Sequence, residues 1–230
     1  MTKIVYIIVV AVLISCGQRG NSGSKIVKTD SLPGQSNMGG NTHIVLVNKT
    51  IKFLWREDKY DTELKDTFYS ISINDTFCKT ITDPERAALG YVATFIGNEC
   101  EWDGEAKDDR SNLKCKILDA LNLGYQCSER HLGFLRKWFK NDTAVQEELK
   151  VDNCPTTPNG ATIQNTFDEI ILTVKGNDIV VSFAANGVNL REGNSWSWTE
   201  SDHFLFDGDN IRLINKNKSK VKHEHSSKME

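Results

Sequence analysis

The 230-residue sequence lacks any apolar run long enough to cross a membrane. Its longest run, residues 4–14, has eleven residues. As a helix this run would cover about 16 Å of a hydrocarbon core about 30 Å thick. The run follows Lys3 and gives way to small residues, a pattern typical of a secretory signal. We therefore expect an exported chain without a membrane-spanning helix.

The common catalytic fingerprints are also missing. The sequence holds no His-Glu-x-x-His, no Gly-x-Ser-x-Gly, no P-loop and no dinucleotide-binding motif. The best Cys/His pair is Cys127 and His131, placed where a helix is expected to begin and where a thiol can become acidic. We expect no catalytic residue, no cofactor and no metal site. Paired carboxylates leave no sequence fingerprint, so an enzyme is disfavoured and not excluded.

An excess of basic residues is missing from the central part of the chain. Residues 43–214 carry 19 Lys and Arg against 28 Asp and Glu, a net charge of −9, whereas residues 17–42 and 215–230 are basic. An acidic domain repels phosphate backbones, so we expect no nucleic-acid partner. A basic protein, a polyamine or a metal cation suits such a surface, and so does a purely solubilising role.

The signal segment ends in a cysteine with a specific context. The sequence Leu13-Ile14-Ser15-Cys16 resembles the lipobox of bacterial lipoproteins. The resemblance implies that residues 1–15 are a signal peptide and that Cys16 becomes the lipidated first residue, with palmitate-type acyl chains holding it in the membrane. Gly17 takes the place of the Asp that retains many Gram-negative lipoproteins at the inner membrane, which implies the outer membrane. The alternative is an ordinary cleaved signal with an incidental cysteine.

Composition divides the remaining chain into three parts. Residues 16–42 are rich in Gly, Ser and Asn, which predicts a flexible tether. Residues 43–214 are long enough for a single domain with its own core. Residues 215–230 are polar and Lys-rich, which predicts a disordered tail.

The order of apolar patterns within the domain predicts an α+β fold. We expect strands near 43–55, 69–73 and 76–81, followed by three to four helices. These helices begin at Thr82 or Asp83, at Asp109 or Ser111, at Ser128 and, for the shortest, after Thr143. Five short apolar stretches then predict an antiparallel meander at 167–174, 179–184, 195–199, 203–206 and 211–214. Strands, then helices, then strands indicate α+β and not a parallel α/β fold.

Five cysteines besides Cys16 lie in the domain, and an exported chain meets an oxidising compartment. The helix positions favour one disulfide between Cys100 and Cys115 and a second between Cys127 and Cys154. A bridge from Cys78 to Cys127 competes with the second.

Two regions could contact a partner. Trp102 lies in an acidic loop between Glu101 and Asp103, where an exposed indole would suit a protein interface. The same loop imitates half of an EF-hand, but Arg110 at the twelfth position would repel the metal. Trp196 and Trp198 share one face of a strand, where they form either core or a contact platform.

These observations favour a non-enzymatic, lipid-anchored envelope protein whose acidic domain binds a protein or another envelope component; a basic protein would suit its charge. An inhibitor or immunity protein that blocks a cell-wall hydrolase is one version of this hypothesis. The alternative is a hydrolase that cleaves cell-wall or glycan material with carboxylates such as Glu101, Asp103 or Asp202. Two carboxyl groups facing each other across a cleft would favour this alternative.

Overall fold

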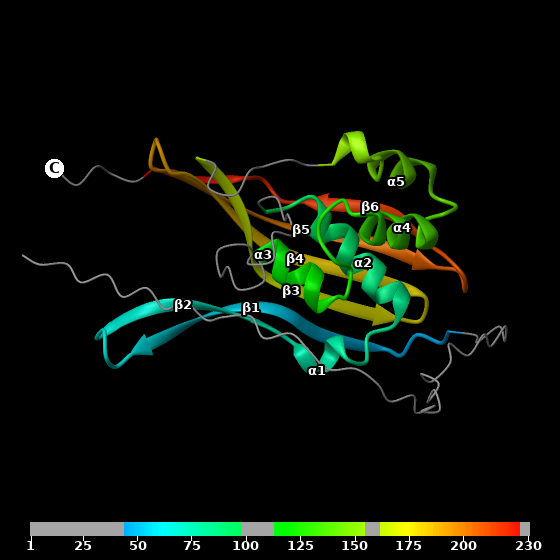
Figure 1. The fold of residues 1–230 in the computed structure, drawn as a ribbon, viewed down its shortest axis with the longest axis horizontal. Coiled ribbons are helices and arrows are strands. Elements are labelled where there is room, and N and C mark those ends of the chain that lie inside the picture. The colour runs from blue at the N-terminus through cyan, green and yellow to red at the C-terminus, as the bar shows by residue number, and fades with distance from the viewer. Residues whose placement is uncertain (1–43, 98–112, 155–161, 226–230) are drawn as a thin grey trace, which may run out of the picture. The chain divides into compact units, whose positions relative to one another are not determined.

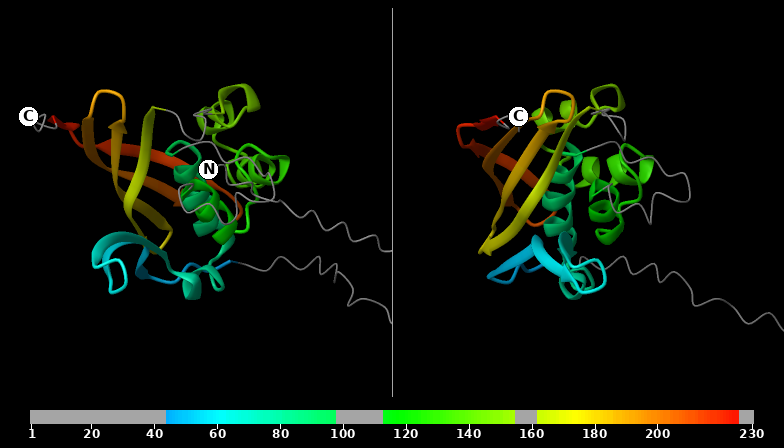
Figure 2. Two further views of the ribbon diagram at one scale, coloured as in Figure 1. Left: turned by 60° about the vertical axis from the view of Figure 1, so that its left-hand side comes forward. Right: turned by 90° about the vertical axis from the view of Figure 1, so that its left-hand side faces the viewer.

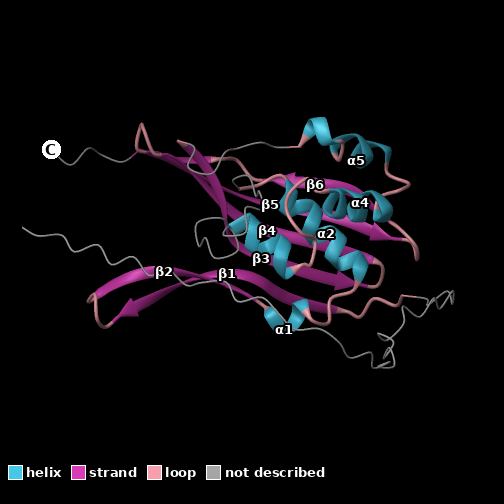
Figure 3. Cartoon of the chain, viewed as in Figure 1, coloured by secondary structure: helices cyan, strands magenta, loops and turns pink. Residues whose placement is uncertain are grey.

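The computed structural model describes residues 44–97, 113–154 and 162–225. They form an α+β fold in which helices and one antiparallel sheet are segregated (Figures 1 and 3). In chain order the elements are β1 (Lys49–Asp61), β2 (Asp66–Ile73), α1 (Asp75–Cys78), α2 (Asp83–Thr94), α3 (Leu113–Ala120), α4 (Glu129–Trp138), α5 (Thr143–Glu148), a 3-10 turn (Val151–Asn153), β3 (Ile163–Lys175), β4 (Asp178–Asn189), β5 (Asn194–Phe206), β6 (Ile211–Lys218) and β7 (Lys222–His225).

The seven described strands pair in the order β2-β1-β3-β4-β5-β6, and β7 pairs with the first residues of β5 beyond the end of β6. Strands β3 to β6 are the predicted meander, and β1 adds to it by pairing with β3. In β4 buried residues alternate strictly with half-buried ones. A strand with this alternation packs one face against the core and turns the other outward.

Helices α2 to α5 lie on one face of this sheet, as the two turned views in Figure 2 show. Helix α2 packs directly against β4 and β5 and is also in contact with α3 and α4. Its close approach to the other helices depends on Gly90, where an added Cβ would lie 2.5 Å from a methyl carbon of Leu123. Helix α2 is therefore the centre of the core between the sheet and the outer helices.

Aromatic rings fill much of this core. The ring of Tyr91 on α2 lies 5.1 Å from that of Phe95, 5.3 Å from that of Phe139 and 5.7 Å from that of Phe204. The contacts with Phe95 and Phe204 are edge-to-face, an arrangement that such rings prefer. The cluster joins α2, the end of α4 and β5, and so fixes α2 over the strand that carries the site described below.

A buried ion pair joins β1 to the start of α2. Lys49 Nζ lies 2.7 Å from Oε1 of Glu85, whose side chain has no exposed surface. The other carboxylate oxygen accepts the backbone N–H of Thr82 at 3.0 Å, which completes a capping box at the helix N-terminus. Thr82 is the N-cap, one of the two residues predicted to start this helix.

Cys127 and Cys154 form a disulfide, the second of the two predicted pairs, so the competing bridge from Cys78 to Cys127 is wrong. Cys78 has a free thiol whose pKa is raised, mainly by burial. Cys115 is also disulfide-bonded, and Cys100 lies outside the described residues. Its predicted pairing with Cys100 therefore stays a prediction.

Several predicted boundaries are wrong. Residues 75–78 form the helical turn α1, capped by the side chain of Asn74, where the sequence predicted a strand. The N-cap of α5 is Asp142, not Thr143. The stretches 195–199 and 203–206 belong to the single long strand β5. The domain does not end at Ile214, since β6 continues to Lys218 and β7 follows where a disordered tail was expected.

Candidate functional site

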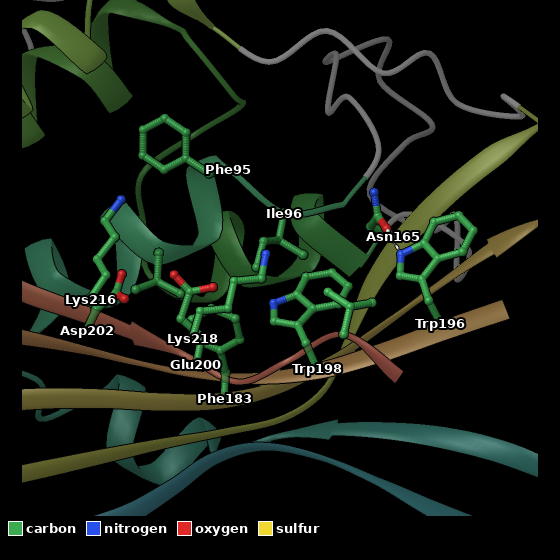
Figure 4. Close-up of a pocket in the computed structure, with 12 residues that line it drawn as sticks. Phe95, Ile96, Asn165, Phe183, Trp196, Trp198, Glu200, Asp202, Lys216 and Lys218 are labelled. Atoms are coloured by element: carbon green, nitrogen blue, oxygen red, sulfur yellow. Dashed lines mark hydrogen bonds between the residues drawn. The ribbon is translucent and has the colours of Figure 1, made fainter. Parts of the chain in front are cut away.

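A pocket of about 420 Å³ lies between the C-terminal end of α2 and the helix-facing side of β4, β5 and β6. We call it the β5 pocket, because Trp196, Trp198, Glu200 and Asp202 of that strand line it (Figure 4). These residues alternate along β5 and therefore point to the same face of the sheet. Phe95 and Ile96 line the pocket from the α2 side, and Lys216 and Lys218 line it from β6.

Trp196 is positioned by residues of the two strands beyond β5. Its cross-strand partner is Gly187 on β4, where an added Cβ would lie 2.2 Å from the indole ring. The ring therefore lies over the glycine and reaches β3, where its Nε1 donates to Oδ1 of Asn165 at 3.1 Å. The indole N–H is thus satisfied within the protein, while the half-buried ring lines the pocket.

Trp198 is buried more deeply, with 9% of its surface exposed. Lys218 covers one side of its ring, with Nζ 4.6 Å from the ring centroid, a distance at which ammonium and indole attract each other. The Nε1 atom of Trp198 is buried without a hydrogen-bond partner among the described residues. Trp198 therefore contributes both core packing and one unused donor near the pocket.

Asp202 is the most unusual group of the site. Only 3% of its surface is exposed, and its Oδ1 has no hydrogen-bond partner within the part of the chain that the structure describes. The pKa of this carboxyl group is raised to about 7, mainly by burial; the negative charges of Glu200 and Glu148 contribute to the rise, whereas Lys216 opposes it. A buried acceptor without a partner is costly, so the site is suited to a ligand that donates a hydrogen bond.

Lys216 links the pocket to the aromatic core. Its Nζ lies 4.8 Å from the ring centroid of Tyr91, 5.5 Å from that of Phe95 and 3.8 Å from the carboxylate of Glu148. The hydroxyl group of Tyr91 donates to the same carboxylate, and burial with this contact raises the pKa of the phenol. The ammonium group is therefore held at the pocket wall by rings and a carboxylate.

The two pocket carboxylates lie side by side. Glu200 and Asp202 are two residues apart on one strand and opposite Lys218 and Lys216 of β6 in the strand register. Among the described residues of the pocket wall, no third carboxylate faces them from the α2 side. The arrangement differs from that of two-carboxylate glycosidases, in which the catalytic groups flank the scissile bond.

The structure brings together only some of the residues that the sequence singled out. Trp196 and Trp198 both line the pocket, whereas Glu101, Trp102 and Asp103 lie outside the described residues. Glu200 and Asn165 were not predicted as site residues, and Lys216 and Lys218 were expected in a disordered tail. The alternation Trp196-x-Trp198-x-Glu200-x-Asp202 could have predicted that Glu200 shares a strand face with the two tryptophans.

Cys127 and His131, the best Cys/His pair in the sequence, do not offer a catalytic thiol. The sulfur of Cys127 is bonded to Cys154 in a disulfide. The backbone N–H of Cys127 donates to Nδ1 of His131 at 3.0 Å. His131 Nε2 lies 3.1 Å from the hydroxyl of Thr94, and burial lowers the pKa of the imidazole to about 4. The histidine is a neutral, structural member of the helical core.

Over the described ranges, no group of three or more His, Cys, Asp or Glu side chains is arranged to hold a metal ion. The same residues include no helix with the length and apolarity that a membrane span needs. No protein-family model, no curated protein and no solved structure matches this chain.

Proposed function

We propose that this protein is a lipid-anchored cell-envelope protein whose domain binds an envelope component in the β5 pocket. The lipobox ending at Cys16 and the Gly- and Ser-rich segment after it support attachment of the domain to a membrane by a tether. Gly17 favours the outer membrane in a Gram-negative host.

The observation that carries the proposal is that Oδ1 of Asp202, in the pocket wall, has no hydrogen-bond partner among the described residues. Buried polar groups in folded proteins nearly always have a hydrogen-bond partner, and an exception calls for a specific cause. A ligand that donates to this oxygen supplies one. The half-buried indole of Trp196 provides the apolar contact area that small-ligand pockets combine with a few polar groups.

Binding is favoured over hydrolysis because of where the carboxylates lie. A hydrolase needs one group to protonate the leaving oxygen and another to act from the other side of the sugar. Glu200 and Asp202 extend from one face of one strand and would approach a ligand from the same side. The inhibitor or immunity role predicted from the acidic loop has no described residue to support it and stays a prediction.

Capture from envelope material tests the binding proposal. The full-length chain, extracted from membranes in mild detergent, is immobilised and incubated with solubilised envelope and digested cell wall, and retained material is identified by mass spectrometry. Wild type is compared with Trp196→Ala and with a matched control, Trp55→Ala, which removes a half-buried indole of β1 outside the pocket. We expect a component that wild type and the control retain and that Trp196→Ala loses at least tenfold.

Equal retention by all three proteins, or no retained component, would contradict binding in this pocket. Attachment is tested on the same material, because the intact mass reports whether Cys16 is the first residue and carries lipid. A bare thiol or a retained leader would contradict the anchor without affecting the pocket.

A further inference from the structure

Above about pH 7, where the carboxyl group of Asp202 is ionised, the charges of the residues that line the β5 pocket balance, although the domain around it is acidic. Glu200 and Asp202 contribute two carboxylates, and their register partners Lys218 and Lys216 contribute two ammonium groups. A cationic ligand that contacts the carboxylates would be repelled by both lysines. An anionic ligand that contacts the lysines would be repelled by both carboxylates. The pocket therefore favours an uncharged ligand over the polyamine or metal cation that the net charge of the domain allows.

The polar groups of the pocket also favour a ligand that can both donate and accept hydrogen bonds. An ionised carboxylate only accepts and an ammonium group only donates, whereas a hydroxyl group does both. A ligand with several adjacent hydroxyl groups can donate to Asp202 and Glu200 and accept from Lys216 and Lys218 at the same time. This is the pattern of a sugar ring and not of an apolar ligand.

The apolar part of the pocket is suited to the same ligand. The indole N–H of Trp196 is already bonded to Asn165, so the ring offers the pocket its apolar surface and not its donor. A sugar ring has apolar C–H faces between its equatorial hydroxyl groups, and these faces pack against flat aromatic surfaces. The volume of about 420 Å³ falls within the range of small-ligand sites, about 300–1,000 Å³.

We propose that the β5 pocket binds an uncharged saccharide unit of the cell envelope, with the ring of Trp196 as its platform and the carboxylates and lysines of β5 and β6 as its hydroxyl contacts. This assignment rests on the proposed binding function and names its ligand class.

Calorimetric titration with defined probes tests the assignment. The probes are soluble neutral oligosaccharides, namely the β-1,4 oligomers of N-acetylglucosamine, the maltose series and the α-linked mannose series. The protein is the full-length chain in a detergent without a sugar headgroup. We expect at least one series to bind wild type and Trp55→Ala, with a change in tryptophan fluorescence, and Trp196→Ala and Lys218→Met to weaken this binding at least tenfold and about threefold, respectively.

Salt dependence separates a neutral ligand from a charged one. Raising NaCl from about 0.1 M to about 1 M shortens the Debye length from about 10 Å to about 3 Å. Affinity for a neutral saccharide should change by less than twofold over this range. Spermidine, added as a cationic probe, should not bind.

Three results would overturn the assignment: no binding across the panel, saccharide binding that Trp196→Ala leaves intact, or pocket-dependent binding of spermidine that weakens with salt. If the capture experiment nevertheless yields a Trp196-dependent component of another chemistry, the binding function holds and only the saccharide class fails.

Discussion

At the scale of single residues, Asp202 is a buried carboxyl group whose pKa is raised to about 7, mainly by burial. Its charged neighbours come from three elements: Glu200 on its own strand, Lys216 on β6 and Glu148 on α5. With a pKa of about 7, the carboxyl group holds its proton in the folded state over a pH range in which an unfolded aspartate, with a pKa of about 3.9, has lost it. The folded state therefore binds more protons than the unfolded state between about pH 4 and pH 7. Over this window the Asp202 contribution to the free energy of unfolding falls as pH rises.

Asp202→Asn should remove this contribution, because the amide has the same shape and no charge. We expect the free energy of unfolding of the variant, relative to wild type, to increase by up to about 4 kcal/mol between pH 4 and pH 8, at about 1.4 kcal/mol per pKa unit. Urea denaturation at a series of pH values measures it. Asp178→Asn is the control, since Asp178 lies on the opposite face of the sheet and contacts His203. A pH-independent difference between Asp202→Asn and wild type would show that the carboxyl group titrates normally.

At the scale of elements, the Lys49–Glu85 pair decides how firmly β1 holds the start of α2. Lys49→Met leaves the carboxylate of Glu85 buried without its cation, while the cap on Thr82 persists. Breaking a buried ion pair costs about 3–5 kcal/mol, and we expect the lower end because Lys49 keeps 24% of its side chain exposed.

The double variant Lys49→Met/Glu85→Gln checks this explanation. Glutamine keeps an acceptor for the N–H of Thr82 and removes the unpaired charge. We therefore expect the double variant to unfold at a higher urea concentration than Lys49→Met alone. A double variant that is less stable than the single one would mean that the charge of Glu85 in the first turn of α2 stabilises the helix by more than its burial without a cation costs.

Elements with strong local signals were predictable from sequence. Ser128 was expected to cap a helix, and its hydroxyl oxygen accepts the N–H of His131 at the start of α4. The meander was also predicted, because its apolar stretches are separated by short turns. Helix α1 was missed because Phe77 and Cys78 have strand-like apolar character, while the deciding contact is the side chain of Asn74, which accepts the N–H of Phe77.

Only part of the pocket could be predicted from the sequence, because its other residues are placed by contacts distant in the sequence. The shared face of Trp196 and Trp198 follows from their spacing, but the choice between core and platform depends on what covers the strand. Lys216 and Lys218 belong to a segment that looks like a polar tail, and they become ordered only through pairing with β5. Long-range pairing of this kind leaves no periodic signal in a Lys- and Asn-rich sequence.

At the scale of the whole molecule, two buried titrating groups act on stability in opposite directions. His131 has a pKa of about 4, below its ordinary value of about 6.5, because burial disfavours the charged ring and Lys114 opposes it further. The unfolded state therefore binds more protons between these two values, and the His131 contribution to the free energy of unfolding rises with pH. The Asp202 contribution falls over nearly the same window, so the two slopes largely cancel in the intact protein.

Separate substitution should reveal each slope. Asp202→Asn is expected to leave a curve that rises by up to about 3 kcal/mol between pH 4 and pH 6.5, from the remaining histidine. His131→Gln should leave a curve that falls by up to about 4 kcal/mol toward pH 7, and the double variant should lack both of these slopes. The two groups share no charged neighbour among those that shift them, so the effects should add. If His131→Gln fails to fold, carbon-13 NMR titration of the imidazole in wild type measures its pKa directly. An imidazole that protonates near pH 6.5 would refute the cancellation.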